Sequence, residues 1–139
     1  MPDMQSKRQI TVTAAIIWHG SRVLITRRPK GTHLEGLWEF PGGKKEAAET
    51  LEECIVREIK EELGVDVDPE RLLLTVSHEY ETKMVYLHIF ECRLLNGSPV
   101  PMEGQEIKWV RPCDMSGYTF PPPDIEVIDF LCRNRSNSL

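Results

Sequence analysis

Three glutamates close together in one segment have the chemistry of a metal site. Glu58, Glu61 and Glu62 stand at i, i+3 and i+4, a spacing that brings side chains together on one side of a helix. Carboxylates this close repel one another, and partial burial raises the cost unless a counter-charge is present. Arg57, four residues before Glu61, is one positive partner for three carboxylates. All-oxygen ligands favour hard divalent cations, so the segment predicts a site for Mg²⁺, with Mn²⁺ as a substitute.

The element that carries these glutamates has clear ends. Thr50 with Glu53 three residues later predicts a capping box, and Gly64 stands where a C-terminal cap belongs, so we expect a helix over 51–63. At about 100° per residue, the three glutamates overlap the edge of the apolar arc. A merely solvated charged face would lie opposite that arc. The apolar arc is formed by Leu51, Cys54, Ile55, Val56, Ile59 and Leu63.

The rest of the chain alternates strand-like and helix-like segments. Residues 10–18 and 22–27 are expected to form a hairpin, and 72–80, 84–95 and 106–110 further strands. A final helix is expected after the prolines at 121–123, with its apolar face formed by Ile125, Ile128, Leu131 and Cys132. This order predicts an α/β (α+β) domain with a mixed sheet between helices, spanning 1–139 with short disordered termini at about 1–7 and 134–139.

Composition and charge exclude several classes of protein. The chain has 139 residues, 40% of them hydrophobic, and a net charge of −5, which fits one folded domain. Nine acidic and four basic residues fall in 42–68, and this excess accounts for the whole net charge. The acidic balance disfavours a stable nucleic-acid partner. Because no apolar run approaches the roughly 20 residues that span a bilayer, and the start is too polar for a signal peptide, we expect a cytoplasmic protein without membrane contact.

The cysteines point to the same compartment. Cys54, Cys92, Cys113 and Cys132 are widely spaced, with no C-x-x-C pair, so neither a zinc site nor a small disulfide framework is indicated. We therefore expect four free thiols in a reducing cytoplasm.

A longer pattern surrounds the three glutamates. Gly43 is followed after five residues by Glu49, and after seven more by Arg57-Glu58-Ile59-Lys60-Glu61-Glu62-Leu63-Gly64-Val65. This resembles the signature box of the Nudix hydrolases, with every fixed position filled, and nine specified positions make chance agreement improbable. The resemblance implies an α/β/α sandwich and hydrolysis of a nucleoside diphosphate linked to another group. Similarity to the MutT-type branch extends over nearly the whole chain, through 25–28, 37–44, 103–105 and 120–125.

The resemblance also implies which residues bind metal and which do the chemistry. Gly42 would give a backbone carbonyl to the metal, beside carboxylates from Glu58, Glu61 and Glu62, and Glu103 would approach from a loop. Glu58 is the first choice as general base and Glu103 the second. The residues implied in structural support are Gly43, Glu49 and Arg57.

A second group of residues is implied in substrate binding, although each also has an ordinary alternative. Arg28 and Lys44 would stabilise phosphates, although an arginine at a strand end is often simply solvated. His33 and Phe40 would line the substrate, although His33 could also be an ordinary loop histidine and Phe40 a core aromatic. Glu39 is implied in substrate binding as well. Taken alone, Glu103 would be an exposed loop acid.

Asp124 is implied in base recognition, or else caps the last helix. The pattern for 8-oxoguanine has Asn at this position, whereas Asp in a Pro-x-Asp-Ile run resembles the cytidine-triphosphate branch. An ionised Asp only accepts hydrogen bonds, while Asn also donates. The departure from Asn therefore favours a cytidine nucleotide over oxidised guanine.

These features together predict a Mg²⁺-dependent pyrophosphohydrolase that converts a normal or modified nucleoside triphosphate to the monophosphate and pyrophosphate, in sanitation of the nucleotide pool. The expected partner is the small-molecule triphosphate, and the protein is a monomer or a homodimer. One alternative is another nucleoside diphosphate derivative, such as a dinucleotide or nucleotide sugar, or an inositol pyrophosphate. The other is a non-catalytic nucleotide reader, against which the complete set of box glutamates argues.

Overall fold

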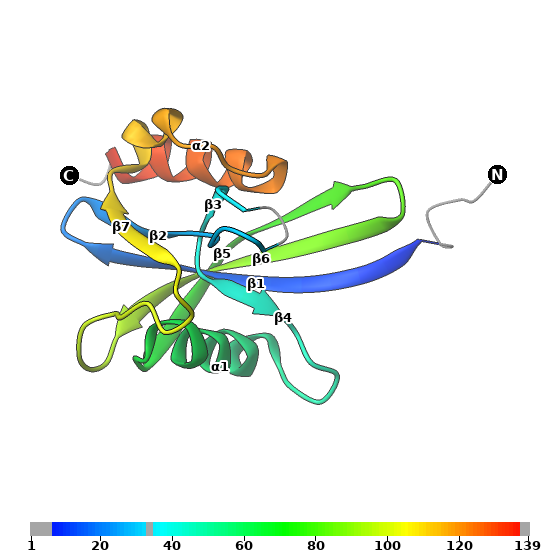
Figure 1. Ribbon diagram of the computed structural model, residues 1–139, viewed down its shortest axis with the longest axis horizontal. Helices are drawn as coiled ribbons and strands as arrows, with labels where there is room; N and C mark the ends of the chain where they lie inside the picture. Colours follow the sequence, from blue (N-terminus) through cyan, green and yellow to red (C-terminus); the bar gives the residue numbers. More distant parts are fainter. Residues whose placement is uncertain (1–6, 33–34, 137–139) are drawn as a thin grey trace.

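Two helices cover opposite faces of a twisted sheet in the computed structural model, which describes residues 7–32 and 35–136 (Figure 1). Helix α1 (Leu51–Leu63) lies against one face and α2 (Pro122–Ser136) against the other, preceded by a short 3₁₀ helix, η2 (Pro112–Gly117). The predicted α/β sandwich is confirmed. Of the termini expected to be disordered, 1–6 and 137–139 lie outside the described residues, whereas Lys7 pairs with Glu79 and α2 includes residues 134–136.

Within the described residues, seven strands form one mixed sheet in the order β3-β2-β1-β6-β5, with β4 paired to β1 and β7 to β2. The β1–β6 pair is parallel, whereas β1–β2, β1–β4 and β5–β6 are antiparallel. The strands are β1 (Arg8–His19), β2 (Arg22–Arg27), β3 (Trp38–Glu39), β4 (Gly42–Lys44), β5 (Val67–Glu79), β6 (Lys83–Leu94) and β7 (Glu106–Val110).

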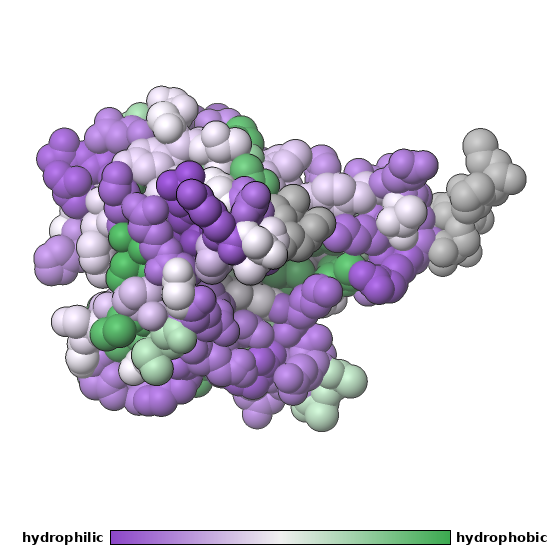
Figure 2. Space-filling view, in the orientation of Figure 1, coloured by the Kyte–Doolittle hydropathy of each residue, from purple (hydrophilic) through white to green (hydrophobic). Residues whose placement is uncertain are grey.

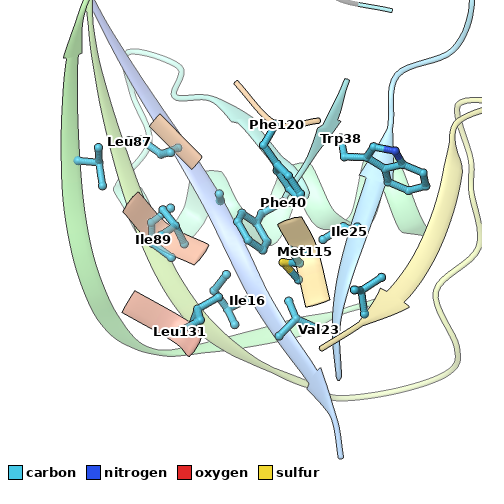
Figure 3. Close-up of a cluster of buried hydrophobic side chains, with 14 residues drawn as sticks. Ile16, Val23, Ile25, Trp38, Phe40, Leu87, Ile89, Met115, Phe120 and Leu131 are labelled. Atoms are coloured by element: carbon cyan, nitrogen blue, oxygen red, sulfur yellow. The ribbon is translucent and has the colours of Figure 1, made fainter. Parts of the chain in front are cut away.

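Strand β1 supplies both layers of the core. Because successive side chains of a strand point to opposite faces, Ala14 and Ile16 pack toward α2 while Ala15 and Ile17 pack toward α1. Figure 3 shows the cluster on the α2 side, where Ile16 lies close to Ile89 and Leu131. Strand β1 and the sheet around it therefore lie between two separate apolar layers.

Helix α1 has the predicted bounds and the predicted caps. The Thr50 hydroxyl accepts from the Glu53 N–H at 3.0 Å, and the Glu53 carboxylate accepts from the Thr50 N–H at 2.8 Å. At the other end Gly64 has φ of 69° and donates its N–H to the Lys60 carbonyl at 3.0 Å. Apart from Leu51 and Val56, which are partly exposed, the apolar arc is buried, and Glu62 is buried with it.

The apolar face predicted for α2 is wrong in part. Ile125 is 48% exposed, whereas Asp124 and Val127 are buried together with Leu131. Ile128 packs at the margin of the core. The buried row at 124, 127 and 131 lies one residue before the predicted row, because contact with the sheet sets the rotation of the helix.

The expectation of four free thiols is also wrong. Cys113 of η2 and Cys132 of α2 form a disulfide, with their Cα atoms 5.0 Å apart, while Cys54 and Cys92 are free and buried. The pairing follows from the packing of η2 on α2, which brings together two cysteines that are 19 residues apart in sequence.

Strand β5 begins five residues earlier than predicted and is irregular. Its pairing with β6 shifts register between Pro69 and Arg71 and again between Leu72 and Leu74. It lies at the end of the strand order. No helix in the described ranges 7–32 and 35–136 is long and apolar enough to cross a membrane.

Candidate functional site

A cavity of about 380 Å³, which we call the polar cavity, opens where α1, β4 and the segment after β2 meet. Four glutamates face it: Glu58 and Glu62 from α1, Glu39 from β3 and Glu103 from the loop before β7. The other lining residues are Thr26, Arg27, Arg28, Pro29, Gly42, Gly43, Lys44 and Gln105. Figure 2 shows that much of the molecular face seen in this orientation is hydrophilic. The polar cavity thus combines concentrated negative charge with three cationic side chains.

A second cavity of about 210 Å³, the apolar cavity, adjoins it. Phe40 and Asp124 line it, as does Tyr80 from the tip of the β5–β6 hairpin. The two cavities share Arg28, Glu39, Gly42, Gly43 and Lys44. The remaining lining residues of the apolar cavity are Val12, Thr13, Ala14, Val85, Leu87, Pro121 and Pro123. A strongly charged lining in one cavity thus adjoins a more apolar lining in the other.

Arg57, on α1, donates hydrogen bonds to several carboxylates. Its Nε and Nη2 atoms donate to the two Glu49 oxygens at 3.0 and 2.6 Å. Its Nη1 donates to Glu58 at 2.8 Å and to Glu61 at 3.1 Å, and Nη2 also reaches the Lys44 carbonyl at 3.1 Å. The hydrogen bonds from Arg57 to Glu49 are the largest cause that lowers the pKa of Glu49 to about 2. The segment that follows β4 is therefore fastened to α1 by Glu49 and Arg57, two of the residues implied in structural support.

Glu62 is the most buried of the glutamates that line the polar cavity, at 8% exposure. The Gly42 N–H donates to its Oε2 at 3.2 Å. Burial first, and then the charges of Glu58, Glu39 and Glu103, raise the pKa of Glu62 to about 9. A carboxylate whose pKa is raised by burial and by neighbouring negative charge is strongly stabilised in its ionised form by a cation. This donor set, oxygen throughout, fits a hard divalent ion.

Close approach requires glycine at Gly42, where the neighbour is backbone, and favours it at Gly43, where the neighbour is the end of a side chain. A Cβ at Gly43 would overlap the Glu58 carboxylate, and one at Gly42 would overlap the Thr13 carbonyl of β1. Strand β4 is thus enclosed between β1 and α1. The absence of a side chain at Gly43 lets the Glu58 carboxylate lie directly on the backbone.

The structure gathers only some of the predicted metal ligands. Gly42, Glu58, Glu62 and Glu103 line the polar cavity, but Glu61 does not. Its carboxylate is 50% exposed and pairs with Arg57 one helical turn earlier. In the part of the chain that is described, no three His, Cys, Asp or Glu side chains converge on one point as ligands do.

The predicted phosphate-binding residues lie on the wall between the cavities. Arg28 Nε is 3.6 Å from a Glu39 oxygen, and within the described residues this buried nitrogen has no hydrogen-bond partner. An unsatisfied buried donor is costly, so a ligand acceptor would be favoured there. Burial raises the pKa of Glu39, partly offset by Arg28. Lys44 is exposed and borders both cavities.

The structure places the residues implied in recognition of the nucleobase in different surroundings. Phe40 is a core residue and also lines the apolar cavity, with its ring centroid 5.6 Å from that of Phe120. Asp124 is 6% exposed, and burial, with the nearby charge of Glu39, raises its pKa to about 8. At neutral pH Asp124 is therefore mostly protonated and can donate a hydrogen bond, unlike the ionised Asp expected from sequence. His33 lies outside the described residues.

Tyr80 and Gln105 are among the lining residues that sequence reasoning missed. Tyr80 ends a predicted strand, and nothing in its local sequence indicates that the hairpin tip reaches the apolar cavity. Gln105 had a signal, since it follows Glu103-Gly104, but no role was inferred for it.

Comparison with known proteins gives a consistent result. The family described as the NUDIX domain matches residues 12–130. The chain is 31% identical over 129 residues to a CTP pyrophosphohydrolase of Escherichia coli (strain K12), covering 93% of this chain and 96% of that protein. It is 33% identical over 132 residues to an 8-oxo-dGTP diphosphatase of Haemophilus influenzae, covering 94% and 97%. Its fold matches the crystal structure of a MutT protein from Methanosarcina mazei Go1 with a TM-score of 0.80, at 26% identity and 96% and 98% coverage.

Proposed function

Because the chain belongs to the Nudix hydrolases, of MutT type, we propose that it hydrolyses a nucleoside triphosphate to the monophosphate and pyrophosphate with Mg²⁺. Hydrolases of this kind generally work with a divalent metal ion. The observation that carries the proposal is the polar cavity, where crowded carboxylates, with Glu62 buried among them, share the lining with Arg28 and Lys44 beside the apolar cavity. The protein would act in the cytoplasm, as a monomer or a homodimer, on the nucleotide pool.

The carboxylates of the polar cavity would hold the metal. Glu58, Glu62 and Glu103, with the Gly42 carbonyl, are the proposed ligands, and Glu61 would join them from the exposed side of α1. Bound Mg²⁺ would supply positive charge that neutralises the phosphate chain and acidifies a water molecule.

Proton transfer falls to a carboxylate of this group. Glu58 is the first choice, because Arg57 holds its Oε1 at 2.8 Å and fixes the carboxylate against Gly43, leaving the other oxygen to accept a proton. Glu103 is the second choice. Arg28 would use its Nε donor on a phosphate oxygen, and Lys44, which borders the same two cavities, would neutralise phosphate charge.

The apolar cavity would take the nucleoside. Phe40 would contact the base, Glu39 and His33 would line the substrate, and Asp124 would read a polar edge. A protonated Asp124 donates one hydrogen bond, which suits an acceptor edge such as that of cytosine. We therefore propose a cytidine triphosphate or its deoxy form as substrate, in line with the name of the E. coli relative.

The second candidate is 8-oxo-dGTP, the substrate named for the H. influenzae relative. The same protonated carboxyl favours this alternative as well, because it places a donor beside an acceptor, as the NH2 and carbonyl groups of an Asn amide do. The raised pKa of Asp124 therefore weakens the sequence argument against oxidised guanine.

A substrate panel tests the function. The purified protein is incubated with the common triphosphates, dCTP, methylated dCTP and 8-oxo-dGTP, with Mg²⁺ or with Mn²⁺, and pyrophosphate release is measured. We expect release from one or a few of them and none after chelation of the metal. No release under any condition would favour a non-catalytic nucleotide reader.

Variants test the metal and carboxylate roles. Glu58→Gln and Glu62→Gln should each reduce kcat by about 10²-fold or more, the size expected for loss of a general base or a key charge. Glu52→Gln is the matched control, since Glu52 is exposed on the first turn of the same helix. Full activity in both site variants would refute the mechanism.

A further inference from the structure

The loop between β6 and β7 is seated on the carboxyl end of α1. The Val100 N–H donates to the Leu63 carbonyl at 2.9 Å, and the Met102 N–H donates to the Glu62 carbonyl at 2.9 Å. Carbonyls in the last turn of a helix lack partners within the helix. The loop therefore satisfies groups that would otherwise need water, and its position is set by α1.

One buried side chain strengthens this attachment. Gln105 is 8% exposed, and its Nε2 donates to the same Glu62 carbonyl at 3.0 Å. Its Oε1 accepts the Glu103 N–H at 2.8 Å. The Nε2 and the Oε1 of Gln105 therefore each have a hydrogen-bond partner. Gly104, with φ of 75°, makes the tight turn that brings Gln105 back to Glu103.

From these contacts we infer that Gln105 is a positioning residue, which fixes the Glu103 carboxylate relative to Glu62 across the polar cavity. The path is short: the Glu103 backbone, the Gln105 amide and the Glu62 backbone are joined by two hydrogen bonds. Both carboxylates line the polar cavity. The inference rests on the proposed function, because it takes Glu103 to act on the metal or the reacting phosphate.

Two substitutions separate the two halves of the amide. Gln105→Glu keeps an acceptor for the Glu103 N–H but, when ionised, cannot donate to the Glu62 carbonyl. Gln105→Met removes both bonds at similar volume. Gln9→Met, at an exposed glutamine of β1, is the matched control. Thermal melts of all three establish that each variant is folded.

The first readout does not depend on activity. Hydrogen exchange at the Glu103 amide, followed by NMR, should be at least about 10-fold faster in Gln105→Met than in the wild type, because one hydrogen bond that protects it is lost. Affinity for Mn²⁺, measured by electron paramagnetic resonance, should fall with it. Unchanged exchange and unchanged Mn²⁺ affinity in a folded Gln105→Met protein would overturn the inference.

The second readout is a double-mutant cycle with Glu103→Gln. Gln105→Met should lower kcat by about 10- to 100-fold in the wild type, as expected for a misplaced reacting group, with little change in KM. In the Glu103→Gln background the same change should have little further effect, because the group to be positioned is already lost. Equal losses in both backgrounds would mean a general structural role and would overturn the inference.

Failure of the proposed function would look different. If the wild type released no pyrophosphate from any triphosphate, the function would be refuted, while amide exchange and Mn²⁺ affinity would still decide whether Gln105 positions Glu103.

Discussion

Asp124 and Glu39 make the two cavities electrostatically dependent on each other. The charge of Glu39 contributes to the raised pKa of Glu62 on one side and to that of Asp124 on the other. Arg28 partly offsets the effect of burial on Glu39 itself. A change of charge in the polar cavity is therefore felt in the apolar cavity.

Asp124 gives a pH dependence of stability. Its pKa is raised from 3.8 to about 8 in the folded protein, so between these values the folded state binds more protons than the unfolded state. The contribution of Asp124 to the free energy of unfolding is therefore largest below about pH 4. It decreases as the pH rises and is lost once the pH passes about 8.

We expect Asp124→Asn to remove this decline. With the metal chelated, the melting temperatures of the two proteins should nearly coincide at pH 4, and the variant should be more stable by several degrees at pH 8 to 9. Thermal melts over that range measure it. A difference that does not change with pH would contradict the assignment, and Asp129→Asn, a few residues further along α2, is the control.

At the scale of the elements, the N-terminal cap of α1 is a separate source of stability. Thr50→Ala removes the side-chain acceptor of the Glu53 N–H and should lower the free energy of unfolding by about 1 kcal/mol. Urea denaturation measures the loss. Thr119→Ala, at an exposed threonine outside the helices, should change it by less than about 0.5 kcal/mol. An equal effect of both would argue against the cap.

Elements defined by local signals were predictable. The capping box and Gly64 mark both ends of α1, and the Gly20 turn marks the first hairpin, because caps and turns depend on residues a few positions apart. The face of α2 depended on distant partners. Both Ile125 and Val127 are apolar, and only contact with the sheet decides which is buried.

The residues of the candidate site divide in the same way, into those predictable from nearby sequence and those that depend on distant contacts. Helical spacing predicted that Glu62 lies at the edge of the core and that Arg57 meets Glu61. It did not predict that Tyr80 reaches the apolar cavity, since that requires the β5–β6 hairpin to be placed in space. The raised pKa of Asp124 was equally out of reach, because it follows from burial.

At the scale of the whole molecule, the Cys113–Cys132 disulfide encloses part of the apolar-cavity wall. The chain between the two cysteines includes Phe120, which packs on Phe40, and Asp124. Closing a loop of this size limits the unfolded chain and stabilises by about 3 kcal/mol in the chain-entropy account.

Reduction should therefore lower the melting temperature by several degrees. Cys113→Ser should show the same lower value and should not respond to reductant, which makes it the matched control. Thiol titration of the unfolded protein should count two thiols before reduction and four after. Four thiols before reduction, with no effect of reductant on melting, would contradict the disulfide.

The irregular edge strand β5 affects whether this protein can associate with other copies of itself through its sheet. Strand β5 is 13 residues long and ends the strand order, a position from which a regular strand could add a neighbouring chain. Two register shifts interrupt it, Pro69 lacks an N–H, and Asp68, Glu70 and Arg71 bring charge to the same stretch. Prolines, bulges and charges of this kind are the devices that keep sheet edges from joining. Continuous strand-to-strand growth into aggregates is thus opposed by the edge itself.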